Sequence, residues 1–180
     1  MPWQRRTDRL LLRRWKPEDH EPFAALNADS EVRKHFVSTL TREESDASIE
    51  LFEAMFPTHG YGLWAVERRD TSEFIGFTGL APMPGGIPGE GGVEVGWRLA
   101  KEHWGFGFAT EAALSSLEFA FDELGLTQVN SITATSNTRS RSVMERIGMR
   151  QHDFFEHPAV PLGNPAREHV RYVVGALPQG

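Results

Sequence analysis

The fold of this 180-residue chain is decided by one stretch, Val93-Glu-Val-Gly-Trp-Arg-Leu-Ala-Lys-Glu-His-Trp-Gly-Phe-Gly-Phe-Ala-Thr-Glu-Ala112. Its first part reads as a strand, which passes through a glycine-rich turn directly into a long helix. Gly105 and Gly107 allow a ligand to approach the backbone closely, because no Cβ stands in the way. The free N–H groups and the positive dipole end of the helix face the turn. The stretch therefore predicts an anion cradle that suits a pyrophosphate.

Other glycine-rich patterns fit this turn less well. A dinucleotide-binding fingerprint needs a third glycine and an early βαβ unit, whereas the third glycine is missing here and the preceding strands are expected to be antiparallel. A P-loop needs G-x-x-x-x-G-K-[ST], which this sequence does not contain. A turn whose glycines serve packing alone remains an open alternative, because a single G-x-G is a weak signal.

Hydrophobic periodicity and capping signals predict the elements on either side. We expect one helix over Pro17–Ala28 and a second that begins at a capping box at Thr41 and ends at Pro57 and Gly60. We expect a third helix over Phe108–Leu124 and a fourth that begins at the N-cap Asn137 and ends at Ile147. We expect strands over Arg9–Trp15, Tyr61–Arg68, Phe74–Ala81, Val93–Leu99, Val129–Thr135, Met149–Glu156 and His169–Gly175. This order predicts a mixed α/β fold with a largely antiparallel first half.

The segment Pro82–Gly92 contains three prolines and five glycines, too many for a regular element. We interpret it as a long mobile hairpin loop inside a single domain over residues 1–180, because each side is too short for a separate core.

Composition excludes several classes of site. The chain has no cysteine, which rules out disulfides, thiolate catalysis, iron–sulfur clusters and Cys-based zinc sites. Its seven histidines lack metal-binding spacing, so no metal site is expected. The net charge of −6 argues against nucleic-acid binding. Residues 1–16 nevertheless carry six basic side chains against Asp8, which favours a solvated strand face and leaves an anion-attracting edge as the alternative.

Nothing in the sequence indicates a membrane protein. The apolar runs fall far short of the roughly 18 residues needed to cross a bilayer. Arginines interrupt the N-terminal stretch where a signal peptide would have its apolar region. We therefore expect a cytoplasmic protein with no membrane partner.

Two motifs carry a resemblance to a known family. The first, Glu94–Leu99 followed by His103–Ala112, closely resembles the acyl-CoA-binding motif of the GNAT superfamily of N-acetyltransferases. Within the pattern [RQ]-x-x-G-x-[GA], Trp104 replaces the first residue, and this substitution is usual in the branch of the ribosomal-protein-alanine N-acetyltransferases. The second, Asn137–Met149, is similar to the family's N-x-x-S-x-x-[VL]-[LM]-[EK]-[KR]-[LI]-G-[FM]. Two motifs in the right order are more specific than either alone.

The resemblance implies a fold, a cosubstrate and a set of site residues. The fold would be a single GNAT-like α/β domain with a mostly antiparallel sheet of six to seven strands and about four helices. Acetyl-CoA would be the cosubstrate. The residues implied in its binding are Trp97, Leu99, Trp104, Gly105, Phe106, Gly107, Phe108, Ala109, Thr110 and Asn137.

Two residues are implied in catalysis. Ser140 would donate a proton to the leaving thiolate, and Glu94 would act as a base directly or through water. Each assignment has a plainer alternative, because Ser140 could be only a first-turn residue and Glu94 only an exposed strand acid. Asn137 could likewise serve only as a helix cap.

The function implied is transfer of an acetyl group from acetyl-CoA to a primary amine, by direct attack in a ternary complex. The acceptor would be a protein N-terminal α-amine or a small molecule, held by residues 29–36 and 157–167, and the loop over 82–92 would cover the acceptor side. A non-catalytic acyl-CoA-binding or regulatory module is the alternative. Homodimers are common in the family, and no sequence feature decides between monomer and dimer.

Overall fold

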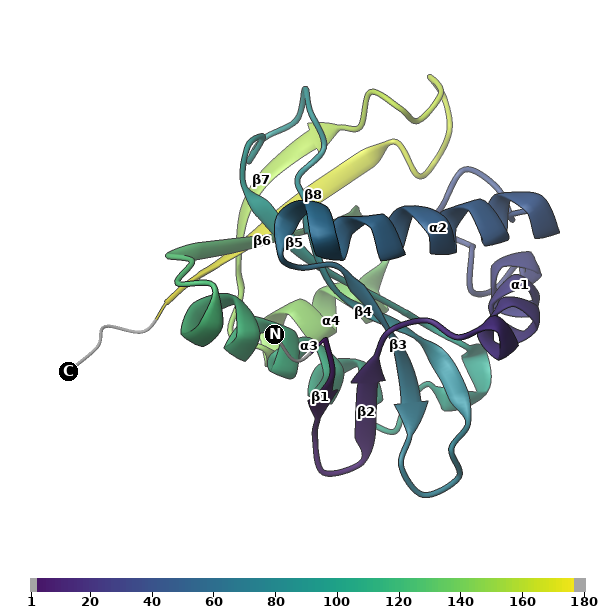
Figure 1. Ribbon diagram of the computed structural model, residues 1–180. Coiled ribbons are helices and arrows are strands. Elements are labelled where there is room, and N and C mark those ends of the chain that lie inside the picture. The colour runs from purple at the N-terminus through teal and green to yellow at the C-terminus, as the bar shows by residue number, and fades with distance from the viewer. Residues whose placement is uncertain (1–2, 177–180) are drawn as a thin grey trace.

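The computed structural model describes residues 3–176, which form one eight-stranded sheet flanked by helices (Figure 1). Across the sheet the strands follow the order β1 (Arg5–Arg6), β2 (Leu10–Arg13), β3 (Leu63–Arg68), β4 (Phe74–Pro82), β5 (Val93–Leu99), β6 (Gln128–Ala134), β8 (Glu168–Gly175) and β7 (Arg150–Glu156). Neighbours pair antiparallel except β5 and β6, which are parallel. The mixed α/β class and the seven expected strands are confirmed.

The eighth strand is β1, so the expected count of six to seven is one too low. Two residues are too short to show the alternation of a strand. Arg5 and Arg6 become a strand only by pairing with Leu12 and Leu11 of β2.

Four α-helices lie within the described residues. They are α1 (His20–Ala28), preceded by a 3-10 turn over Pro17–Asp19, α2 (Arg42–His59), α3 (Phe108–Glu118), which continues as a π-helical turn over Phe119–Glu123, and α4 (Thr138–Arg146). None of these helices in residues 3–176 has the length and apolar character needed to cross a membrane.

The end of α2 differs from the expectation. Pro57 does not stop the helix, which continues to His59. The stop is Gly60, which adopts a left-handed φ of 77° and donates its N–H to the carbonyl of Phe56 at 3.0 Å. Glycine takes this conformation without the steric penalty of a Cβ.

The two faces of the sheet carry different helices. Phe77 of β4 belongs to a cluster with Phe23 of α1 and Ile49 of α2. The next residue, Thr78, lies 3.5 Å from Ser116 of α3. Because successive side chains of a strand point to opposite faces, α1 and α2 cover one face at this point and α3 the other.

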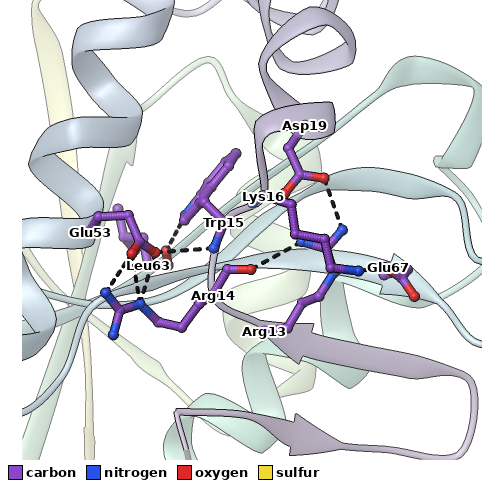
Figure 2. A network of polar contacts seen from close by, with 8 residues as sticks. All are labelled: Arg13, Arg14, Trp15, Lys16, Asp19, Glu53, Leu63 and Glu67. Atoms are coloured by element: carbon purple, nitrogen blue, oxygen red, sulfur yellow. Dashed lines mark hydrogen bonds and ion pairs between the residues drawn. The ribbon is translucent and has the colours of Figure 1, made fainter.

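Arg13, the last residue of β2, and Arg14, which follows it, tie the chain to the helical layer (Figure 2). Arg13 donates to both carboxylate oxygens of Asp19, at 2.7 and 2.9 Å, and through Nε to Glu67 of β3 at 2.6 Å. Arg14 donates through Nε and Nη2 to Glu53 of α2, at 2.9 and 2.5 Å. Buried charges persist in proteins when they are paired and hydrogen-bonded in this way. The network fixes the path of the chain from β2 into α1.

The loop between β4 and β5 is folded onto the sheet. Met83 and Ile87 are buried, and the N–H of Gly86 donates to Glu90 at 2.9 Å. A Cβ on Gly92 would come within 2.9 Å of Asn130 Nδ2 on β6. The loop expected from the glycines and prolines is therefore present, and it is anchored by apolar side chains close to the start of β5.

Candidate functional site

A left-handed glycine turn joins β5 to α3. The chain makes a 3-10 turn over Lys101–His103, and Gly105 and Gly107 then adopt φ values of 83° and 80°. Glycine alone adopts such angles readily. The indole N–H of Trp104 donates to the carbonyl of Leu99 at 2.9 Å, which folds the turn back on the end of the strand.

This turn presents a row of backbone N–H groups at the start of α3. Gly107 occupies the N-cap position, and no side chain caps the helix. Among residues 3–176, no acceptor lies within hydrogen-bond distance of six consecutive amides, those of Gly105, Phe106, Gly107, Phe108, Ala109 and Thr110. Unpaired amides at the positive end of a helix favour a bound anion. These amides lie at the turn where the sequence predicts an anion cradle.

The turn between β1 and β2 places a guanidinium beside the cradle. Arg9 donates through Nε to Glu111 at 2.6 Å and through Nη1 to the carbonyl of Phe106 at 2.8 Å. Thr7 donates to the same carboxylate at 2.5 Å. Although burial opposes ionisation, the hydrogen bonds from Thr7 and Arg9 lower the pKa of Glu111. Arg9 is thus exposed, paired with a carboxylate and adjacent to the turn, and an anion-attracting edge here stays a prediction.

A second guanidinium approaches the turn from α4. Arg139 lies over the ring of Trp104, 4.4 Å from its centroid. Motif analysis missed both Arg9 and Arg139, because each reaches the turn from a distant part of the chain. The basic N-terminal segment was the signal that pointed toward Arg9.

Beside the turn, β5 and β6 separate. Their ladder contains one parallel pair, Glu94 with Asn130. The other contacts between the two strands are made by side chains of β6. Asn130 Nδ2 donates to the carbonyl of Val93 at 3.1 Å, and the hydroxyl of Ser131 donates to the carbonyl of Val95 at 2.9 Å. Alternate residues of a strand direct their backbone groups to the same edge. Trp97 is therefore the next residue on this edge, at an opening that β6 does not close.

Glu94 lies at the closed end of this opening. Its side chain shares one face of β5 with those of Gly96 and Arg98, because they alternate along the strand. Burial raises the pKa of Glu94 to about 7. A Cβ built on Gly96 would meet no atom within 4 Å, so there is open space two residues along this face of the strand. A carboxyl with a pKa near 7 can accept a proton at neutral pH.

The start of α4 holds the other two expected residues. Asn137 Oδ1 accepts the N–H of Ser140 at 3.2 Å, and its Nδ2 donates to Thr133 Oγ1 at 3.0 Å. Asn137 is thus a helix cap, as the plainer alternative held, and its amide has a second hydrogen left to donate. Ser140 is half-buried, and its hydroxyl has no hydrogen-bond partner within residues 3–176.

Two loops meet at the C-terminal end of β6. His35, between α1 and α2, lies with Nδ1 3.0 Å from the hydroxyl of Ser136. Val160 and Ala166, between β7 and β8, pack on Ala134 at the end of β6. These are the segments expected to hold an acceptor. Across the described part of the chain, no group of three or more potential metal ligands comes together.

The comparisons with known proteins agree with this geometry. A family model described as the acetyltransferase (GNAT) domain matches residues 9–150, which include β2 to β6, the glycine turn and α4. The chain belongs to the GNAT acetyltransferase family. Membership of this GNAT family makes the chain an N-acetyltransferase, the class that the two sequence motifs indicate.

Several known proteins are similar to this GNAT domain in sequence or structure. It is 31% identical to the FsC-acetyl coenzyme A-N(2)-transacetylase of Aspergillus fumigatus over 165 residues, covering 87% of this chain and 69% of that protein. The crystal structure of a GNAT acetyltransferase from Bacillus anthracis matches with a TM-score of 0.80 at 25% identity, over 96% of this chain and 98% of that one. The ribosomal-protein-S5-alanine acetyltransferase of Vibrio fischeri shares the fold, with a TM-score of 0.71 at 14% identity over 96% of both chains.

Proposed function

We propose that this GNAT domain transfers the acetyl group of acetyl-CoA to a primary amine by direct attack within a ternary complex. The observation that carries the proposal is the separation of β5 and β6 after the pair of Glu94 with Asn130, beside a turn whose amides 105–110 have no acceptor within residues 3–176. A pyrophosphate suits these amides. The amides of a pantetheine arm suit the free edge of β5 at Trp97 and Leu99, as in the addition of a strand to a sheet.

The side chains around the opening supply the proton transfers. Acetyl-CoA, when bound, supplies the acetyl group as a thioester. Glu94 takes the proton that the amine nitrogen loses as its bond to the acetyl carbon forms, directly or through water. Ser140 gives a proton to the sulfur as the carbon–sulfur bond breaks. Positioning and polarisation of the thioester carbonyl by backbone N–H groups supply most of the rate gain.

The chemistry favours an acceptor that is easily deprotonated. Making an α-amine neutral at pH 7 costs about 1 kcal/mol, whereas a lysine costs about 4.6 kcal/mol. A carboxyl with a pKa near 7 is a sufficient base for the first. We therefore propose a protein N-terminal α-amine or a small-molecule amine as the acceptor. We also propose that residues 1–180 form a single domain and that the reaction takes place in the cytoplasm. A homodimer stays a prediction.

Calorimetric titration with acetyl-CoA tests the cradle. We expect micromolar binding by the wild type and its loss in Gly107→Glu, which places a negative side chain among the amides. Gly125→Glu is the matched control, because Gly125 also has a positive φ, of 65°, and open space around it, at the other end of the same helical segment. Absence of binding by the wild type would contradict the proposal.

Release of free thiol in mixtures of acetyl-CoA and amines tests the transfer itself. An enzyme releases CoA with at least one acceptor, whereas a non-catalytic acyl-CoA-binding module binds acetyl-CoA and releases no thiol with any. Binding of acetyl-CoA without thiol release would therefore contradict acetyl transfer and support a non-catalytic acyl-CoA-binding module.

A further inference from the structure

Arg98 is a half-buried arginine without a counter-charge among residues 3–176. Its Nη1 donates to Asn27 Oδ1 at 2.9 Å, and its guanidinium lies 4.6 and 5.1 Å from the ring centroids of Phe36 and Phe77. Nε is also buried, and no hydrogen-bond partner reaches it within residues 3–176. Burial, together with the charge of Arg33, lowers the pKa of Arg98 to about 9. A buried donor without a partner is unfavourable and needs an explanation.

The unpaired Nε belongs to the edge of the guanidinium that binds carboxylates elsewhere in this protein. Arg14 uses Nε on Oε1 of Glu53 at 2.9 Å and Nη2 on Oε2 at 2.5 Å. Arg171 uses the same two atoms on Oδ2 of Asp153, at 2.6 and 2.5 Å. This planar edge matches the two oxygens of a carboxylate. Nε of Arg98 has no such partner among the described residues, so the edge is not used internally.

Arg98 shares its face of β5 with the proposed base. Glu94, Gly96 and Arg98 alternate along the strand, so the Cα atoms of the two charged residues lie about 13 Å apart at roughly 3.3 Å per residue. Between them, a Cβ on Gly96 would meet no atom within 4 Å. Phe36, which stacks on Arg98, is 40% exposed, so this stack borders solvent. Gly96, with open space above it, thus lies between a carboxyl and a guanidinium on one face of β5.

We propose that Arg98 binds a carboxylate carried by the acceptor, while the acceptor's amine lies over Gly96 toward Glu94. This inference rests on the acetyl transfer proposed above and narrows its acceptor to molecules that bear both an amine and a carboxylate. Amino acids and related amino carboxylic acids have this chemistry, whereas simple alkylamines do not.

The test is a binding measurement that needs no turnover. Wild type and Arg98→Gln, each saturated with CoA, are titrated with N-acetylated straight-chain amino acids from N-acetylglycine to N-acetyl-6-aminohexanoate, and with the carboxamide of each. These compounds correspond to products of the proposed reaction. We expect at least one acid to bind the wild type about 10- to 100-fold more tightly than its carboxamide. In Arg98→Gln this ratio should fall to about 1.

Two further variants separate the edge of Arg98 from general positive charge. The guanidinium of Arg33 also lies over the ring of Phe36, 4.3 Å from its centroid. Arg33→Gln removes this second positive charge and leaves the edge of Arg98 intact. It should keep the acid preference of the wild type. Arg98→Lys keeps a charge without the planar edge and should lower the ratio at least about threefold. If Arg98→Gln does not fold, the Arg98→Lys variant provides the test instead.

Three results would overturn the Arg98 site. They are equal binding of acids and carboxamides by the wild type, an equal loss of preference in Arg33→Gln, and an unchanged ratio in Arg98→Lys. Thiol release without an acid preference would contradict this site and leave acetyl transfer standing. An acid preference that depends on Arg98, without thiol release, would support the site and contradict acetyl transfer.

Discussion

Arg9 and Glu111 form an ion pair of 2.6 Å that ties the first hairpin to the first turn of α3. Arg9 also bonds the carbonyl of Phe106, so its charge lies beside the amides of the cradle. We predict that Arg9→Ala weakens acetyl-CoA binding about 3- to 10-fold at low salt, through loss of a nearby cation, and less at high salt because of screening. Calorimetry at two salt concentrations measures this. Arg6→Ala, an exposed arginine of the same hairpin, is the control, and equal losses in both variants would refute the prediction.

The raised pKa of Glu94 predicts a pH-dependent rate. Since burial raises this pKa to about 7, the carboxylate form that accepts a proton becomes dominant only above neutral pH. The kcat/KM for an α-amine should therefore rise with pH and bend near pH 7, in addition to the acceptor's own titration. In Glu94→Gln the bend should vanish and the rate should fall about 100-fold. A variant that keeps the bend would show that another group titrates.

The same pKa predicts a dependence of stability on pH. In the unfolded chain a glutamate titrates near 4.3, so between about pH 4.3 and 7 only the folded state holds this proton. Rising pH through that window therefore removes stability, by about 3 to 4 kcal/mol for this group. Relative to the wild type, Glu94→Gln should gain stability between pH 5 and pH 8. Chemical denaturation at both values measures the difference, and a gain that is the same at both would contradict the assignment.

Ser140 should affect turnover more than binding. Its hydroxyl has no partner in the described structure, so Ser140→Ala leaves no bonded group unpaired. We expect kcat to fall about 10- to 100-fold, through loss of a proton donor, with the acetyl-CoA Kd unchanged within about twofold. Ser142→Ala is the control, since that hydroxyl donates to the carbonyl of Thr138 within the same helix. Equal kcat values for both variants would make Ser140 only a first-turn residue.

The buried pairing of Arg13 should matter for stability alone. Asp19→Asn removes a carboxylate that receives two bonds from Arg13, at 2.7 and 2.9 Å, and should lower the free energy of unfolding by about 3 kcal/mol. Asp70→Asn, in an exposed pair with Arg68, should leave it nearly unchanged. Urea denaturation of both variants measures this. A folded Asp19→Asn protein should bind acetyl-CoA normally, and a large loss of affinity would place the network in the site.

Local signals in the sequence were sufficient for most of the fold. The strand over Val93–Leu99, the glycine turn after it and the Asn137 cap are encoded by residues that are close in sequence, and the structure contains all three. The two differences between the expected and the observed elements also have local causes. Arg5–Arg6 is too short to show a pattern, and Pro57 sits close enough to the end of α2 for the helix to continue to His59.

By itself, the sequence determined the order of elements, the motifs of the family and the presence of a glycine turn that begins a helix. Only the tertiary structure decided that β5 and β6 separate after one pair, that Arg9 arrives at the turn, and that Glu94 and Arg98 flank an open space. The reason is physical. Helix caps and turns depend on neighbouring residues, whereas burial, pKa and the meeting of charges depend on side chains that packing brings together from distant parts of the chain.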